Sequence, residues 1–239
     1  MGEFLEKVWH FVTTVFYALV AVLLVFVLIK SVEGNFIYSL SRGTLLAWNK
    51  EASYLGIIIG LVAYILYTLF TIIPQVEHNL NWFMKFTHEL THTLTALIFF
   101  RKIREFVVKD RECYVSYKAH VIGHVPIALS PYCIPIYTLM ILPFRFTGHN
   151  KYLIFFDILI AFTYAFHMHM FIKQTRYTQS DIRGCGPVRS TTFIAATHLM
   201  FLSLLISIPK GGIWNSLSRV FYEYPEQIIS KTVNFIGIL

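Results

Sequence analysis

Several apolar runs, each about twenty residues long, constrain the fold of this chain more than any other feature of its sequence. An α-helix needs about twenty apolar residues to cross a bilayer, and such runs occur at 10–29, 54–73 and 152–172. Further apolar segments cover 82–100, 125–144 and 191–208. We therefore expect an all-α polytopic membrane protein with about six transmembrane helices.

The composition supports this class. The chain has 239 residues, of which 56% are hydrophobic and 14% charged, whereas soluble domains carry about 25% charged residues. The net charge of +7 does not require a nucleic-acid partner, because Lys and Arg mark the cytoplasmic loops of multi-span proteins. The first run lacks a small-residue cleavage site, so we expect a retained span and no cleavable signal peptide.

A His-Glu-x-x-His motif lies inside the apolar segment 82–100, formed by His88, Glu89 and His92. On a helix, positions i and i+4 share a face, so both imidazoles can bind one metal ion. Glu89 then lies beside the metal, where its carboxylate can take a proton from a bound water. Histidine and glutamate are costly within a bilayer and usually mark a site there. The sequence therefore predicts two zinc ligands and a general base.

The segments after the motif predict further elements. The β-prone runs 106–108 and 114–117 flank a charged centre, which is typical of a hairpin. The segment 125–144 contains four prolines and is expected to form a kinked or broken helix. The tail 211–239 is amphipathic. With no repeat or linker, residues 1–239 are expected to form a single membrane-embedded domain.

The run "FTHELTHTLTALIFFRKIREF", residues 86–106, resembles the first core helix of site-2-protease-type intramembrane zinc metalloproteases. In that family a β-hairpin and two further core helices follow the motif, and an Asp supplies the third zinc ligand. The resemblance covers about 82–208, a metalloprotease-like core, and is closest to compact members without a PDZ domain. It implies Zn²⁺ as cofactor and a peptide bond in or near a membrane segment of another protein as substrate. The Leu-Asp-Gly motif of the family is absent from this sequence.

Three residues compete as the third ligand. Asp181, in a Ser-Asp pair, matches the pair that compact family members carry before their last span. At a rise of 1.5 Å per residue, His167 lies about 9 Å from the end of its helix, and His92 lies about 12 Å from the end of its own helix. These similar depths in the membrane favour His167 as the third ligand. Asp157 is expected near the opposite face of the membrane, where its side chain would form a polar contact with a neighbouring helix. We favour Asp181, with His167 as the alternative.

Two other functions remain open on the sequence. His120 and His124 repeat the i, i+4 spacing, and His167 and His169 add two histidines, as in a membrane diiron oxygenase or desaturase. That class uses adjacent His pairs, which this chain lacks. A catalytically silent zinc-binding scaffold is the other alternative.

The sequence also predicts an orientation. Lys and Arg are more numerous on the side that carries segments 101–118 and 173–190, which we place in the cytoplasm. The strand at 114–117 could then hold a substrate extended by β-addition. The expected location is a bacterial inner (cytoplasmic) membrane, and the expected partners are the lipid bilayer and a membrane-protein substrate.

Overall fold

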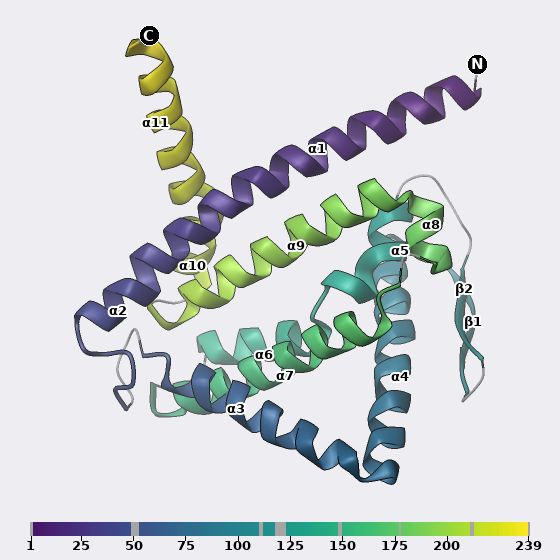
Figure 1. Cartoon of the computed structure of the whole chain (residues 1–239), viewed down its shortest axis with the longest axis horizontal. Coiled ribbons are helices and arrows are strands. Elements are labelled where there is room, and N and C mark those ends of the chain that lie inside the picture. The colour runs from purple at the N-terminus through teal and green to yellow at the C-terminus, as the bar shows by residue number, and fades with distance from the viewer. Residues whose placement is uncertain are drawn as a thin grey trace.

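A computed structural model describes residues 2–48, 53–109, 112–117, 123–147, 150–176, 178–210 and 213–238. This part of the chain is mostly helical, with one two-stranded antiparallel sheet (Figure 1). The α-helices are α1 (Gly2–Ser31), α2 (Tyr38–Ser41), α3 (Leu55–Leu69), α4 (Pro74–Ile98), α5 (His124–Cys133), α6 (Ile136–Thr147), α7 (Leu153–Gln174), α8 (Ser180–Cys185), α9 (Pro187–Ser207), α10 (Ile213–Ser218) and α11 (Tyr224–Ile238). The strands are β1 (Ile103–Val108) and β2 (Cys113–Tyr117).

Among the described residues, four helical segments are long and apolar enough to cross a membrane, namely 4–41, 55–72, 153–174 and 187–207. The pair α5 and α6 would make a fifth span if the two helices count as one. These segments are compatible with an integral membrane protein. The first segment is longer than expected, because α1 continues through the π-helical turn Val32–Ile37 into α2.

The motif helix α4 is longer than the sequence indicated and is not among the four segments. Residues 75–81, which separate the predicted span 54–73 from the apolar segment 82–100, belong to its first turns. Pro74 occupies the start of the helix, where its missing N–H leaves no hydrogen bond unmade. The polar side chains of these turns and of the motif make α4 less apolar than its neighbours.

The proline-rich segment is broken, as the sequence predicted. α5 and α6 meet at an angle of 77°. The break falls at Ile134, whose backbone is extended (φ −103°, ψ 107°). A residue that precedes a proline is disfavoured in the helical region, and Pro135 follows directly.

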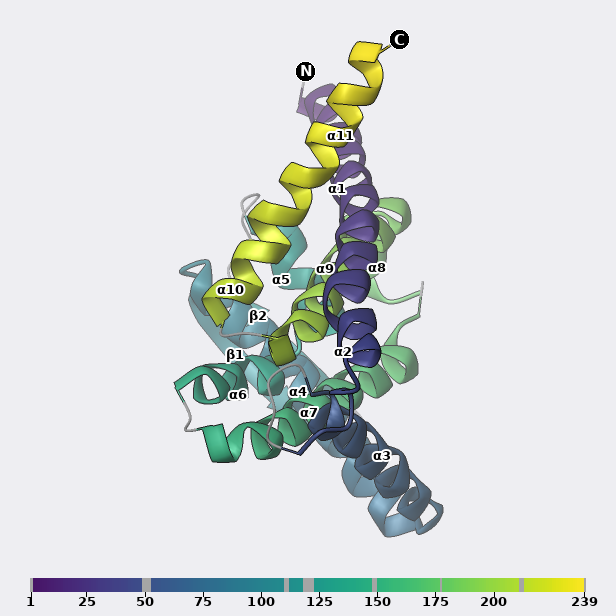
Figure 2. The same cartoon turned by 90° about the vertical axis from the view of Figure 1, so that its left-hand side faces the viewer.

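The helices pack in a layered arrangement (Figures 1 and 2). α9 packs against α1 on one side and against α5 on the other. α3 packs on α7 through Gly56 and Gly60, where a Cβ would collide with the α7 backbone. α3 and α4 form a V whose apex lies away from α1. The hairpin β1–β2 packs against α4, and the ring of Phe106 meets the ring of Phe86 edge-on.

Candidate metal centre

α4 presents the motif on a buried face. His88, Glu89 and His92 are exposed to only 9%, 7% and 7%. The spacing of four residues places both imidazoles on the side of α4 that packs against α5, with ring centroids 5.0 Å apart. Two histidines and a carboxylate are thus held together in the interior.

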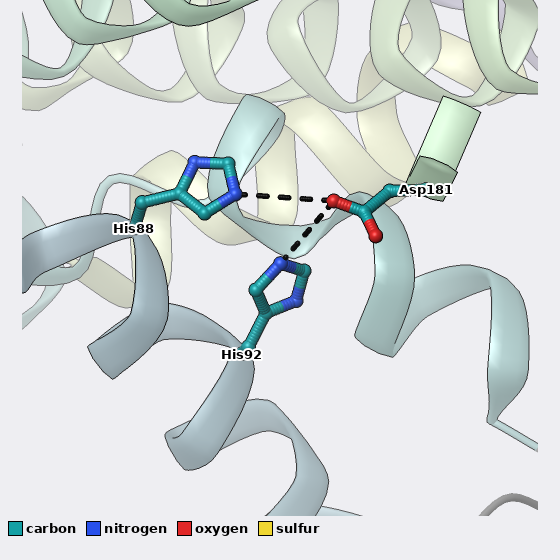
Figure 3. A group of neighbouring side chains, drawn as sticks. All are labelled: His88, His92 and Asp181. Atoms are coloured by element: carbon teal, nitrogen blue, oxygen red, sulfur yellow. Dashed lines mark ion pairs between the residues drawn. The ribbon is translucent and has the colours of Figure 1, made fainter. Parts of the chain in front are cut away.

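Asp181 reaches the same place from the short helix α8. Gly186 ends α8 with a φ of +86°, a conformation that glycine adopts without strain, and the chain then enters α9. Ile182 and Cys185 of α8 are buried in one apolar cluster with Leu129 of α5. This packing fixes α8, so that the Asp181 side chain points toward α4 (Figure 3).

The carboxylate of Asp181 faces both motif histidines. Its Oδ2 atom lies 3.5 Å from Nε2 of His92 and 3.9 Å from Nε2 of His88 (Figure 3). One ligand atom from each of the three residues falls within 4.8 Å of the others. A tetrahedral zinc ion with bonds of about 2.0–2.2 Å holds its ligands about 3.3–3.6 Å apart. The two distances from Asp181 are close to that spacing and the third pair lies within 4.8 Å, so the three side chains can converge on one zinc ion.

Hydrogen bonds orient both imidazoles for this role. Nδ1 of His92 donates to the backbone carbonyl of Ile127, 2.8 Å away. Nδ1 of His88 donates to Oε1 of Gln174 at 3.1 Å. A proton held on Nδ1 leaves Nε2 of the neutral ring with a lone pair, and that lone pair faces an anionic oxygen. A cation between them removes the repulsion, and ligating histidines are typically fixed in this way.

Tyr132 of α5 completes the surroundings of the carboxylate. Its hydroxyl donates to Oδ2 of Asp181 at 3.1 Å, and its ring meets the ring of His88 edge-on. Burial disfavours ionisation of Asp181, but when no metal lies between them, a proton on the imidazoles of His88 and His92 outweighs burial as a hydrogen-bond donor and as a positive charge, and holds the pKa of this carboxyl well below its ordinary value of 3.8. Asp181 is therefore an anion at neutral pH.

A cavity of about 500 Å³ opens beside Glu89 and His88. Glu89 follows His88 directly and lines this cavity, so its carboxylate can reach a water or a substrate atom that enters there. The arrangement offers three ligands, one adjacent carboxylate and an access path. These are the parts that metal-assisted hydrolysis needs.

The other candidate ligands lie elsewhere. The His167 ring packs against His198, with centroids 5.7 Å apart, and its Nε2 has no hydrogen-bond partner. Asp157 is paired with Arg145 at 2.9 Å, bonded between helices as expected. Within the described ranges, His88, His92 and Asp181 form the only three-residue group with metal-binding spacing.

The histidines of the diiron hypothesis are dispersed. Nδ1 of His124 lies 3.7 Å from Sγ of Cys185, and Nδ1 of His169 is bonded to the Tyr64 hydroxyl at 2.8 Å. His120 falls outside the described residues. No second metal group accompanies the first in the described part of the chain.

Two residues of the site had weak or absent sequence signals. Tyr132 lies among the prolines of the segment 125–144, for which the sequence predicted only a kinked or broken helix. Gln174, at the end of α7, belongs to no motif. Its role depends on the approach of α7 to α4, which only the tertiary structure reveals.

Comparison of the chain with protein-family models, with curated proteins and with solved structures gives no match.

Proposed function

We propose that this chain is an intramembrane zinc metalloendopeptidase, in which His88, His92 and Asp181 hold the zinc ion. The observation that carries the proposal is the convergence of these three ligand atoms within 4.8 Å beside Glu89. Three protein ligands leave a fourth position open, which is the arrangement of catalytic rather than structural zinc. The resemblance of residues 86–106 to site-2-type proteases points the same way.

Each residue of the site has a separate role in the proposed mechanism. Zinc supplies Lewis acidity, which lowers the pKa of a water that it binds and polarises a peptide carbonyl. Glu89 accepts the proton of the attacking water and passes it to the leaving amine nitrogen. Ile127 and Gln174 keep the two imidazoles oriented, and Tyr132 keeps the carboxylate of Asp181 in place.

The membrane setting forms part of the same proposal. α4 would cross the bilayer together with the apolar helices that surround it, and the bent α5–α6 pair would complete six spans. The polar face of α4 is buried against protein, which is how intramembrane polar groups are accommodated. We place the protein in a bacterial inner membrane, with the hairpin on the cytoplasmic side.

The hairpin is suited to presenting the substrate. β1 and β2 form a two-stranded sheet, so each strand keeps one edge free of a strand partner among the described residues. A substrate helix must unwind before its backbone can reach the metal, and a strand edge can hold the unwound segment extended. Cys113, where β2 begins, lines the cavity that Glu89 also borders.

The test uses the full chain purified in detergent. Wild-type protein is expected to hold one zinc per chain and to cleave an unfolded membrane-segment peptide. Glu89→Gln is expected to keep the zinc and the melting temperature while it lowers the cleavage rate at least about a hundredfold, as loss of a general base does. Full activity in Glu89→Gln would refute the mechanism. If the wild-type protein holds zinc but does not cleave the peptide, the result would favour a scaffold. If it holds two iron ions per chain, the result would favour a diiron oxygenase.

A further inference from the structure

The cavity beside Glu89 has a pronounced positive charge that the proposed peptide hydrolysis does not itself require. Its lining includes Lys85 of α4, Lys173 of α7 and Arg176 of the loop that follows α7. Glu89 is the one acidic residue among the lining residues that the structure describes. Three cations therefore surround one carboxylate.

The three cations differ in their surroundings. Nζ of Lys173 donates to Oδ1 of Asn81 at 2.9 Å and lies 3.8 Å from Oε1 of Glu77, so its charge is partly offset. Lys85 is half-buried at the wall of the cavity. Arg176 is exposed, and its guanidinium has no carboxylate partner in the described part of the chain. Arg176 is therefore the cation best placed to bind an incoming anion.

Arg176 is carried by a braced turn. The amide N–H of Gln179 donates to the carbonyl of Arg176 at 3.0 Å, and Oε1 of Gln179 accepts the amide N–H of Arg176 at 3.0 Å. The turn leads directly into α8, which carries Asp181. The position of the Arg176 backbone is thus linked to that of the metal centre.

We infer that this cavity recognises a carboxylate side chain of the peptide substrate, about two residues from the bond that is cut. The inference rests on the proposed function and specifies its substrate class. Lys85 and Glu89 share one face of α4 and are separated by about 6 Å along the helix axis. An extended peptide advances about 3.3 Å per residue, so 6 Å corresponds to about two residues.

The chemistry of the cations agrees with this ligand. Arginine binds a carboxylate through two parallel N–H donors, and lysine adds a point charge. An Asp or Glu side chain that projects into the cavity from an extended segment can pair with Arg176 or with Lys85, while the neighbouring backbone passes Glu89. Peptides with a basic residue at that position meet like charge and are disfavoured.

The test measures binding without catalysis, in the full-length Glu89→Gln variant in neutral-lipid nanodiscs. The probes are three fluorescent peptides, identical except for Asp, Asn or Lys two residues from a central Leu–Ala bond. One set of three carries this residue before the bond, and a second set carries it after the bond. The Asp peptide is expected to bind about three- to tenfold more tightly than the Asn peptide for one or two ion pairs at a partly exposed site, and the Lys peptide the least.

Charge reversal supplies the second arm. Adding Arg176→Glu to Glu89→Gln is expected to remove the preference for Asp and to favour the Lys peptide. Arg42→Glu is the matched control, because Arg42 stacks over the Tyr38 ring after α2 and does not line the cavity. The control is expected to keep the preference for Asp.

The outcomes are separable from those of the proposed function. Equal binding of the three peptides, or no peptide binding, overturns the inference even if the wild-type protein cleaves. A preference for Asp without cleavage by the wild type retains the recognition site and refutes the protease. If Arg176→Glu alters only attachment to vesicles of anionic phospholipid, the cations serve lipid phosphates and the inference is wrong.

Discussion

The Tyr132 hydroxyl donates to Oδ2 of Asp181 at 3.1 Å, and the same oxygen faces Nε2 of His92 at 3.5 Å. One carboxylate oxygen thus joins α5, which supplies the tyrosine, to α8, which supplies the aspartate, and to the motif on α4. The candidate ligand set depends on this meeting of three separate elements.

Tyr132→Phe is expected to weaken zinc binding about ten- to a hundredfold, because it removes the hydrogen bond that orients a ligand. Competition with a chromophoric chelator measures the affinity. Tyr137→Phe is the control, since its hydroxyl bonds Thr87 on the same helix α4 but not Asp181. Equal zinc affinities for the two variants would contradict a role of Tyr132 at the metal.

Zinc is expected to leave the protein as the pH falls below neutrality, because an imidazole must be unprotonated to bind a metal and protons compete with zinc for its nitrogen. Asp181 does not cause this loss. Its pKa is lowered from 3.8, so the stabilisation that its charge supplies is present above 3.8 and is lost only as the pH falls through the lowered pKa. Zinc content after dialysis at each pH measures the loss. A zinc content that does not fall with pH while the chain stays folded would contradict the histidine assignment.

The three cysteines are expected to differ in reactivity. Cys113 is half-buried, whereas Cys133 and Cys185 are fully buried. Burial also raises the pKa of the Cys185 thiol to about 11, which leaves almost no thiolate near pH 8. A maleimide reagent is therefore expected to label one cysteine in the folded protein, and Cys113→Ser to abolish that labelling. Rapid labelling of Cys185 would show that α8 is not packed as described.

The Arg145–Asp157 pair provides a test of the fold away from the metal. Both side chains are buried, and replacing only Arg145 with leucine leaves an uncompensated carboxylate, at an expected cost of about 3–5 kcal/mol of unfolding free energy. Replacing both residues with leucine is expected to restore most of that loss. Thermal unfolding in detergent compares the variants. Equal destabilisation by the single and double replacements would contradict the pairing.

The sequence predicted local features well, because they depend on neighbouring residues. The apolar runs indicated long helices, the i, i+4 spacing placed His88 and His92 on one face, and the four prolines of 125–144 indicated the broken helix that α5 and α6 form. The helix α4 was less well predicted. The motif segment was expected to begin at residue 82, whereas α4 begins at Pro74, directly after the predicted span 54–73.

The third candidate ligand depends on long-range packing and was harder to identify. Counting the rise along each helix favoured His167, but depth does not determine the direction of a side chain, and the His167 ring packs against His198. Asp181 was favoured only through a resemblance. Its approach to α4 follows from the packing of Ile182 and Cys185 against α5, which no local pattern predicts.

The most direct test of the central claim is the zinc content of the purified chain and of three variants. The account predicts one zinc per chain in the wild type and in His167→Ala, and little zinc in His92→Ala and Asp181→Ala, with all four proteins folded. Loss of zinc in His167→Ala, with full zinc in Asp181→Ala, would contradict the assignment of the metal centre.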